Sequence, residues 1–234
     1  MIDSINPDLI AFLKNIIHPP SGNKVLKTTN GFFVEAGAYD GQTASNTLFL
    51  EVERNWTGLL VEPDPYFFTQ LIGKNRNVWA INACLSPFNY TSKLYFEESN
   101  TQVGRLKSSE TKELATEVPC FPLDALLLAL ERTTVDFFSL DVEGDEVAVL
   151  KTIPFDKFDI KALAVEYRHG IKEEYLDVMK RNNYNLNKTL SVDHPEINVY
   201  VDDFICYLSA TLAFHSGIAK HNVNIPLHYQ YNFK

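Results

Sequence analysis

The sequence of 234 residues has few basic residues and no long apolar run. Its 21 lysines and arginines are outnumbered by 30 aspartates and glutamates, so the net charge is −9 at pH 7. This charge works against binding to nucleic acid or to an anionic membrane, and we expect neither as a partner. No stretch reaches the roughly 18 apolar residues of a membrane span, and the N-terminus shows no basic region followed by an apolar core. We therefore expect no signal or transmembrane segment in this chain.

Cysteine is scarce, and its spacing excludes the usual metal and redox motifs. Cys84, Cys120 and Cys206 lie far apart and form no C-x-x-C pair. We expect them to be buried free thiols, because unpaired cysteine is mostly a core residue. Three segments fit the glycosylation pattern: Asn55-Trp56-Thr57, Asn89-Tyr90-Thr91 and Asn187-Lys188-Thr189. The compartment therefore stays open between the cytoplasm and the lumen of the secretory pathway.

The length fits a single α/β domain with short additions. We expect an N-terminal cap segment over residues 1–30, a domain over 31–208 and a C-terminal tail over 209–234. Within the domain, residues 86–122 depart from the βα alternation and predict a hairpin insertion. Its polar stretch 99–116 is expected to form a lid over the substrate, because long polar loops in compact domains are often functional. In this stretch Arg105 is a candidate for gripping an anionic group, although a solvated surface arginine is the commoner role.

The most informative stretch is a strand–turn–helix–strand unit over residues 31–64. Phe32–Val34 is a short apolar run that predicts a buried strand ending in a tight turn. A helix over 43–54 and a strand over 59–61 are predicted to follow, and that second strand ends at Glu62. This is the βαβ arrangement of nucleotide-binding sheets, in which an acid at the second strand end accepts hydrogen bonds from a ribose.

The turn lacks the three glycines of the dinucleotide motif G-x-G-x-x-G. Its spacing is instead Gly37-x-x-x-Gly41, and acids such as Glu35 flank it. Carboxylates would repel a diphosphate, but they suit a ligand that carries a ribose together with positive charge. S-adenosylmethionine, which has a sulfonium and an ammonium group, fits this description. The alternative is that the glycines serve packing alone, because α/β folds reuse such turns.

The next two strand ends add to the expected cofactor site. Pro63 and Asp64 form the turn after Glu62, and Asn82 and Ala83 belong to a strand predicted over 78–85. Glu35-x-Gly37-x-x-x-Gly41 together with Glu62 resembles the first two motifs of a class I methyltransferase, and this resemblance implies that Asn82 and Ala83 contact adenine. Asparagine also caps strand ends, which is the alternative role of Asn82.

A second group of acids follows a predicted strand over residues 135–140. Asp141 and Glu143 lie two residues apart on an extended segment and therefore project to the same side. Paired carboxylates at a strand end can bind a divalent cation, accept a proton from a hydroxyl or face a methyl sulfonium. The alternative is that Glu143 and Asp145 stabilise the N-terminus of the next helix. A metal is therefore possible and not established.

His169 follows a predicted strand over residues 162–165. It is the best candidate for a general base, because a histidine titrates near neutral pH and this one is expected beside Asp141. The alternative is a surface residue that flanks the following helix.

Several motifs together resemble the FkbM-type methyltransferases. They are Phe33-Val34-Glu35-Ala36-Gly37-Ala38-Tyr39-Asp40-Gly41, Leu60-Val61-Glu62-Pro63-Asp64, Asn82-Ala83-Cys84-Leu85-Ser86 and Ser139-Leu140-Asp141-Val142-Glu143-Gly144. The runs Ser45-Asn46-Thr47-Leu48 and Asn55-Trp56-Thr57-Gly58 are similar to the Star-like branch. The resemblance implies a Rossmann-like class I methyltransferase sheet of seven mostly parallel strands with an antiparallel closing hairpin. It also implies S-adenosylmethionine-dependent methylation of hydroxyl groups, often on sugars or natural products. The Star-like branch is membrane-anchored and acts in trafficking. Because we expect no such anchor in this chain, we expect that localisation not to carry over.

Two functions follow from this reading. The first is an O-methyltransferase that acts on a small molecule or glycan, and the second is a catalytically silent binding module that keeps the fold. The expected cofactor-binding residues are Glu35, Gly37, Gly41, Glu62, Pro63, Asp64, Asn82, Ala83 and Asp141. The expected catalytic residues are Asp141, Glu143 and His169.

Overall fold

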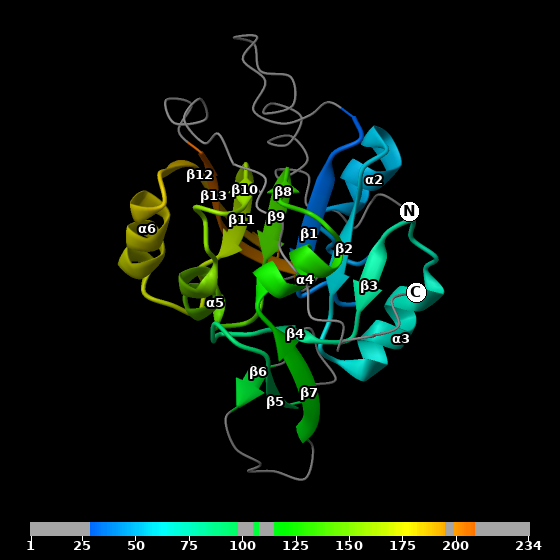
Figure 1. Ribbon diagram of the computed structural model, residues 1–234. Coiled ribbons are helices and arrows are strands. Elements are labelled where there is room, and N and C mark those ends of the chain that lie inside the picture. The colour runs from blue at the N-terminus through cyan, green and yellow to red at the C-terminus, as the bar shows by residue number, and fades with distance from the viewer. Residues whose placement is uncertain (1–28, 98–104, 108–114, 195–198, 209–234) are drawn as a thin grey trace.

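The computed structural model describes residues 29–97, 105–107, 115–194 and 199–208 and contains a seven-stranded sheet (Figure 1). Its strands, in spatial order, are β12 (Tyr184–His194), β13 (Val199–Leu208), β11 (Ala162–Glu166), β9 (Phe137–Leu140), β1 (Phe32–Ala36), β2 (Thr57–Val61) and β3 (Trp79–Ile81). Five strands run parallel, and β13 is antiparallel to both β11 and β12. The predicted fold class, including the antiparallel closing hairpin, is confirmed.

The central strands are apolar because both faces of the sheet are covered. All five residues of β1 are buried, and its alternate side chains enter different clusters. Phe32 and Val34 pack into one core cluster, and Phe33 packs into another on the opposite face. Parallel strands that are buried on both faces show continuous apolar runs rather than alternation. The strand order brings the carboxyl ends of β1, β2, β9 and β11 to the same edge of the sheet, called here the carboxyl edge.

Short helices connect these strands. They are α2 (Leu48–Arg54), α3 (Pro65–Gly73), α4 (Leu123–Ala129), α5 (Glu146–Thr152) and α6 (Lys172–Arg181). Two strand pieces, β8 (Thr134–Val135) and β10 (Asp159–Ile160), form a separate parallel pair. Among the described residues, no helix is long and apolar enough to cross a bilayer.

The predicted start of the first helix at residue 43 is wrong. The helix begins at Leu48, and Ala44 has a φ of 56°, which lies outside helical conformation. The cause is Glu35, whose carboxylate accepts hydrogen bonds from three successive residues, 45 to 47, and fixes them in a loop.

The predicted insertion forms a small sheet of its own. β4 (Cys84–Leu85), β7 (Ala115–Phe121), β5 (Ser92–Glu97) and β6 (Arg105–Lys107) follow in that spatial order. In Figure 1 this sheet lies below the main one, near its carboxyl edge. The single strand predicted over 78–85 is wrong, because the chain leaves β3 at Asn82 and enters the small sheet at β4. Most of the predicted lid, the predicted cap and the tail lie outside the described residues, as does the side chain of Arg105.

Two of the three cysteines form a disulfide, so the expectation of three free thiols is wrong. Cys84 and Cys120 are paired across β4 and β7, with their Cα atoms 4.4 Å apart. They lie 36 residues apart in sequence, and only the register of the two strands brings them together. Cys206 is buried and free, as expected. The asparagines of the three glycosylation patterns are all exposed.

Candidate functional site

Gly37 brings the ends of β1 and β9 into contact. Its φ is +81°, and a Cβ atom built there would lie 1.8 Å from the carbonyl oxygen of Asp141. No other residue type fits this position, because the backbone conformation and the close approach both require glycine. The N–H of Gly37 also donates to the carbonyl of Val61, which closes the turn onto β2. Three strand ends therefore converge on this turn.

Glu62 is held at the end of β2 by two backbone amides. Its Oε2 accepts from the N–H of Tyr39 at 2.6 Å, and its Oε1 accepts from the N–H of Asp64 at 2.8 Å. The residue is only 5% exposed, and burial raises the pKa of its carboxyl to about 8 although the two amides act to lower it. Each carboxylate oxygen has two lone pairs, so both oxygens can accept a further hydrogen bond. The group is thus oriented in advance for hydroxyl donors.

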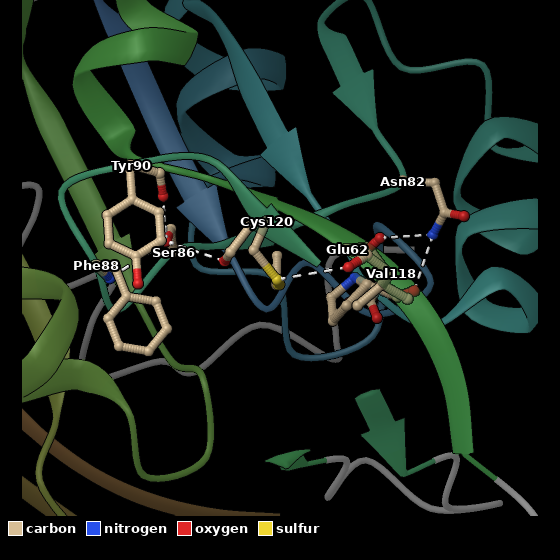
Figure 2. The surroundings of a disulfide bond; sticks show 10 residues. Glu62, Asn82, Ser86, Phe88, Tyr90, Val118 and Cys120 are labelled. Carbon is tan, nitrogen blue, oxygen red and sulfur yellow. Dashed lines mark hydrogen bonds between the residues drawn. A yellow bond between two sulfur atoms is a disulfide. The ribbon is translucent and has the colours of Figure 1, made fainter. Parts of the chain in front are cut away.

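The neighbours of Glu62 shape its turn. Asp64 caps α3 by accepting from the N–H groups of Tyr66 and Phe67. The side-chain amide of Asn82 donates to the carbonyls of Glu62 and of Pro63, at 2.9 and 3.0 Å (Figure 2). Ala83 is fully buried, and its N–H donates to the carbonyl of Glu62. The hydrogen bonds of Asp64, Asn82 and Ala83 therefore fix the turn after β2, so these predicted cofactor residues position Glu62.

Glu35 and Gly41 hold the loop that follows β1. Glu35 is buried and receives hydrogen bonds from residues 45–47, and Nη1 of Arg76 lies 3.7 Å from its Oε2. The same Nη1 donates to the carbonyl of Gly41, and Nε of Arg76 pairs with Glu51 at 2.7 Å. Sequence reasoning missed Arg76. No local pattern marks it, because these partners are 25 and 35 residues away.

A second cluster, called here the acid–histidine cluster, consists of Asp141, Glu143, Glu166 and His169 at the ends of β9 and β11. The two strands are parallel neighbours in which Leu140 pairs with Val165, so Asp141 and Glu166 follow in register. Nε2 of His169 lies 2.8 Å from Oε2 of Glu143 and 3.9 Å from Oε1 of Glu166. The structure thus brings all three predicted catalytic residues to one place.

The carboxyl groups of this cluster repel one another. Burial, together with the charges of Glu143 and Glu146, raises the pKa of Asp141, and burial together with Asp141 and Glu143 raises the pKa of Glu166. Within the described part of the chain, Oδ1 of Asp141 and Oε2 of Glu166 are buried and receive no hydrogen bond from a nitrogen or hydroxyl donor, and the two side chains face each other. These two oxygens are therefore able to share a proton or to take a hydroxyl or a cation.

Glu146 fixes the backbone of the loop that carries Asp141 and Glu143. It is fully buried; its Oε1 accepts from the N–H groups of Val142 and Gly144, and its Oε2 accepts from the hydroxyl of Tyr175. Asp145 stands at the N-cap of α5 but makes no side-chain cap bond. Glu146 thus orders the turn that leads into α5.

Glu166 was missed, although a signal for it exists. It is the acid that directly follows the strand predicted over residues 162–165, just as Glu62 directly follows the strand predicted over 59–61. Residues at that position face the ligand side of open α/β sheets.

Comparisons with known proteins give the family of the chain and similar folds. The family described as methyltransferase FkbM domain matches residues 35–203. No curated protein matches the chain in sequence. A magnesium protoporphyrin IX methyltransferase from Synechocystis PCC 6803, solved with bound SAH, is 10% identical with a TM-score of 0.50, and the match covers 89% of this chain and 81% of that one. A methyltransferase FkbM from Methylobacillus flagellatus KT is 13% identical with a TM-score of 0.49, covering 88% of this chain and 56% of that one.

Proposed function

Because the chain belongs to the FkbM methyltransferase family, we propose that it transfers a methyl group from S-adenosylmethionine to a hydroxyl of a small molecule or sugar. The observation that carries this proposal is Glu62, a buried carboxyl group that two backbone amides orient at the end of the second strand. It stands beside a glycine turn that has no room for a Cβ atom at Gly37. This combination suits the ribose of a nucleoside placed close to the backbone.

The charge of the carboxyl edge fits the rest of the cofactor. S-adenosylmethionine, when bound, supplies an electrophilic methyl group on a positively charged sulfur. The carboxyl groups of Glu62 and Asp141 lie at this edge, and the positive charge of a bound S-adenosylmethionine stabilises their ionised forms. Gly37 lets the backbone approach the methionine part, and the turn that Asn82 holds lies where the adenine is expected. The residues present therefore fit the group.

Methylation of a hydroxyl also needs an acceptor for its proton. Oδ1 of Asp141 and the imidazole of His169 are the two candidate acceptors in the acid–histidine cluster. Nε2 of His169 lies 2.8 Å from Oε2 of Glu143, so the carboxylate of Glu143 orients the ring and stabilises the positive charge that the ring gains with the proton. A positioned base contributes about 10²- to 10⁴-fold to such a reaction.

The test combines cofactor titration with turnover. We expect calorimetry to show saturable S-adenosylmethionine binding, and a panel of hydroxylated small molecules and sugars to include one that releases S-adenosylhomocysteine. On that acceptor, His169→Ala should lower turnover by about 10²- to 10⁴-fold while the cofactor Kd stays nearly unchanged. Asp141→Asn should lower turnover at least as much. Asp177→Asn, which changes an exposed acid of α6 paired with Arg181, is the matched control and should leave both quantities unchanged. Failure to bind at millimolar cofactor would refute the proposal and favour the catalytically silent module.

The disulfide favours one of the two compartments. We assign the chain to an oxidising one, because disulfides such as Cys84–Cys120 persist there and are reduced in the cytosol. The exposure of Asn55, Asn89 and Asn187 supports the same choice. Mass spectrometry of the protein from its source should find the two cysteines resistant to alkylation before reduction, whereas free thiols and unmodified asparagines would contradict it.

A further inference from the structure

We propose that Glu143, Glu166 and His169 form a binding site for a divalent metal cation at the carboxyl edge of the main sheet. Glu143 lies in the loop after β9, Glu166 is the last residue of the neighbouring strand β11, and His169 lies in the loop after β11. One ligand atom from each lies within 4.8 Å of the others. Two carboxylates and one imidazole form a donor set that suits a cation such as Mn²⁺.

The separations fit a bound ion. A cation bonded at about 2.1 Å places adjacent octahedral ligands about 3 Å apart and opposite ligands about 4.2 Å apart. The Nε2 atom of His169 lies 2.8 Å from Oε2 of Glu143 and 3.9 Å from Oε1 of Glu166. Small side-chain rotations therefore convert the observed contacts into a coordination shell.

An independent observation points to a ligand at this place. Glu166 is 8% exposed, and its Oε2 is buried and receives no hydrogen bond from a nitrogen or hydroxyl donor among the residues that the structure describes. Its side chain instead faces that of Asp141, which it can contact by a hydrogen bond only when one of the two carboxyls is protonated. Oδ1 of Asp141, which lies next to Glu166, is likewise buried and receives no hydrogen bond from such a donor. A buried carboxylate that lacks a partner is strongly destabilising unless a cation or a proton neutralises it. A cation at the acid–histidine cluster neutralises both groups at once.

The adjacent group of acids is a poorer site. Asp141, Glu146 and Glu166 also place ligand atoms within 4.8 Å of one another. The oxygens of Glu146, however, already accept hydrogen bonds from two backbone amides and from the hydroxyl of Tyr175. Glu146 is therefore a supporting residue, and Asp141 is left as a neighbour of the cation with a free acceptor oxygen.

This assignment rests on the proposed function and narrows its chemistry. A cation next to the acceptor hydroxyl lowers the pKa of that hydroxyl and fixes its position. His169 cannot take the proton at Nε2 while that nitrogen binds the cation. The proton from the hydroxyl then passes to Oδ1 of Asp141, which makes Asp141 the base and His169 a ligand.

The experiment measures metal binding without cofactor or turnover. The full chain is stripped with a chelator and titrated with Mn²⁺ at neutral pH, with electron paramagnetic resonance reporting the free ion. We expect saturable binding at micromolar concentrations, and a rise in melting temperature when Mn²⁺ is added. His169→Ala and Glu166→Gln should each weaken binding by at least about tenfold. Glu174→Gln changes an exposed acid of α6 and should bind like the wild type.

Separate outcomes decide the two proposals. Weak binding that all four proteins share would overturn the site and favour a proton shared between Asp141 and Glu166. Because His169 is partly exposed, its variant is expected to fold, so a loss of binding there supports the site even if Glu166→Gln is unstable. Mn²⁺ binding without S-adenosylmethionine binding would uphold the metal site and refute the methyltransferase proposal. S-adenosylmethionine binding without Mn²⁺ binding would uphold the methyltransferase proposal and refute the metal site.

Discussion

Glu62 gives the sharpest test of the cofactor site. In the structure each of its oxygens already accepts one backbone N–H, which leaves each with one lone pair for a ribose hydroxyl. A hydrogen bond to a charged, partly desolvated group contributes about 1.5–3 kcal/mol. Glu62→Ala should therefore weaken S-adenosylmethionine binding by about 2–4 kcal/mol, which is about 30- to 700-fold in Kd. The assay is calorimetric titration, with circular dichroism to check that the fold survives.

The pH dependence of the same titration tests the state of this carboxyl group. Burial raises its pKa to about 8 in the free protein, so the group is largely protonated at pH 6. A cationic ligand with two donor hydroxyls favours the ionised form. Binding should therefore release a proton, and the Kd should fall as pH rises from 6 towards 8 and level off above that value.

The matched control is Glu62→Gln, which keeps the size of the side chain but cannot ionise. The ammonium group of the ligand titrates alike with both proteins, so the difference between the two pH profiles isolates Glu62. The reasoning would be refuted if Glu62→Ala bound the cofactor as tightly as the wild type, or if both profiles had the same slope.

Two further predictions concern the scaffold. Replacing Cys84 and Cys120 by serine should lower the free energy of unfolding by about 4 kcal/mol, because the disulfide closes a loop of 36 residues. In denaturant titrations, reductant should destabilise the wild type and the control variant Cys206→Ser to the same extent. If the stability of the wild type did not respond to reductant, the pairing would be contradicted. Gly37→Ala should cost about 3 kcal/mol or more, since it adds a backbone overlap at 1.8 Å to a φ of +81°. Gly73→Ala adds a Cβ atom that meets nothing within 4 Å at the end of α3, so it should be neutral or stabilise slightly when both variants are compared by thermal melting. Equal effects of the two substitutions would exclude this explanation.

The sequence by itself determined the main sheet and the acidic residues at the carboxyl ends of its strands. Apolar runs such as Phe32–Val34 are buried strands, and the acids Glu62 and Asp141 stand at strand ends as predicted. These features are local: a strand, its glycine turn and the acid after it lie within a few residues, so their types and spacing carry the information. The same local signal was available for Glu166.

Only the tertiary structure decided which side chains from distant parts of the chain contact one another. The helix start moved to Leu48 because Glu35 binds the residues before it, and that carboxylate is also near Arg76, far along the chain. Likewise, the register of β4 and β7 pairs two cysteines, and the register of β9 and β11 places Asp141 beside Glu166. Such contacts depend on how distant segments align. A one-residue shift in strand register turns every side chain to the opposite face. The continuous apolar run of a strand that is buried on both faces does not specify that alignment, because either face of the strand fits the core.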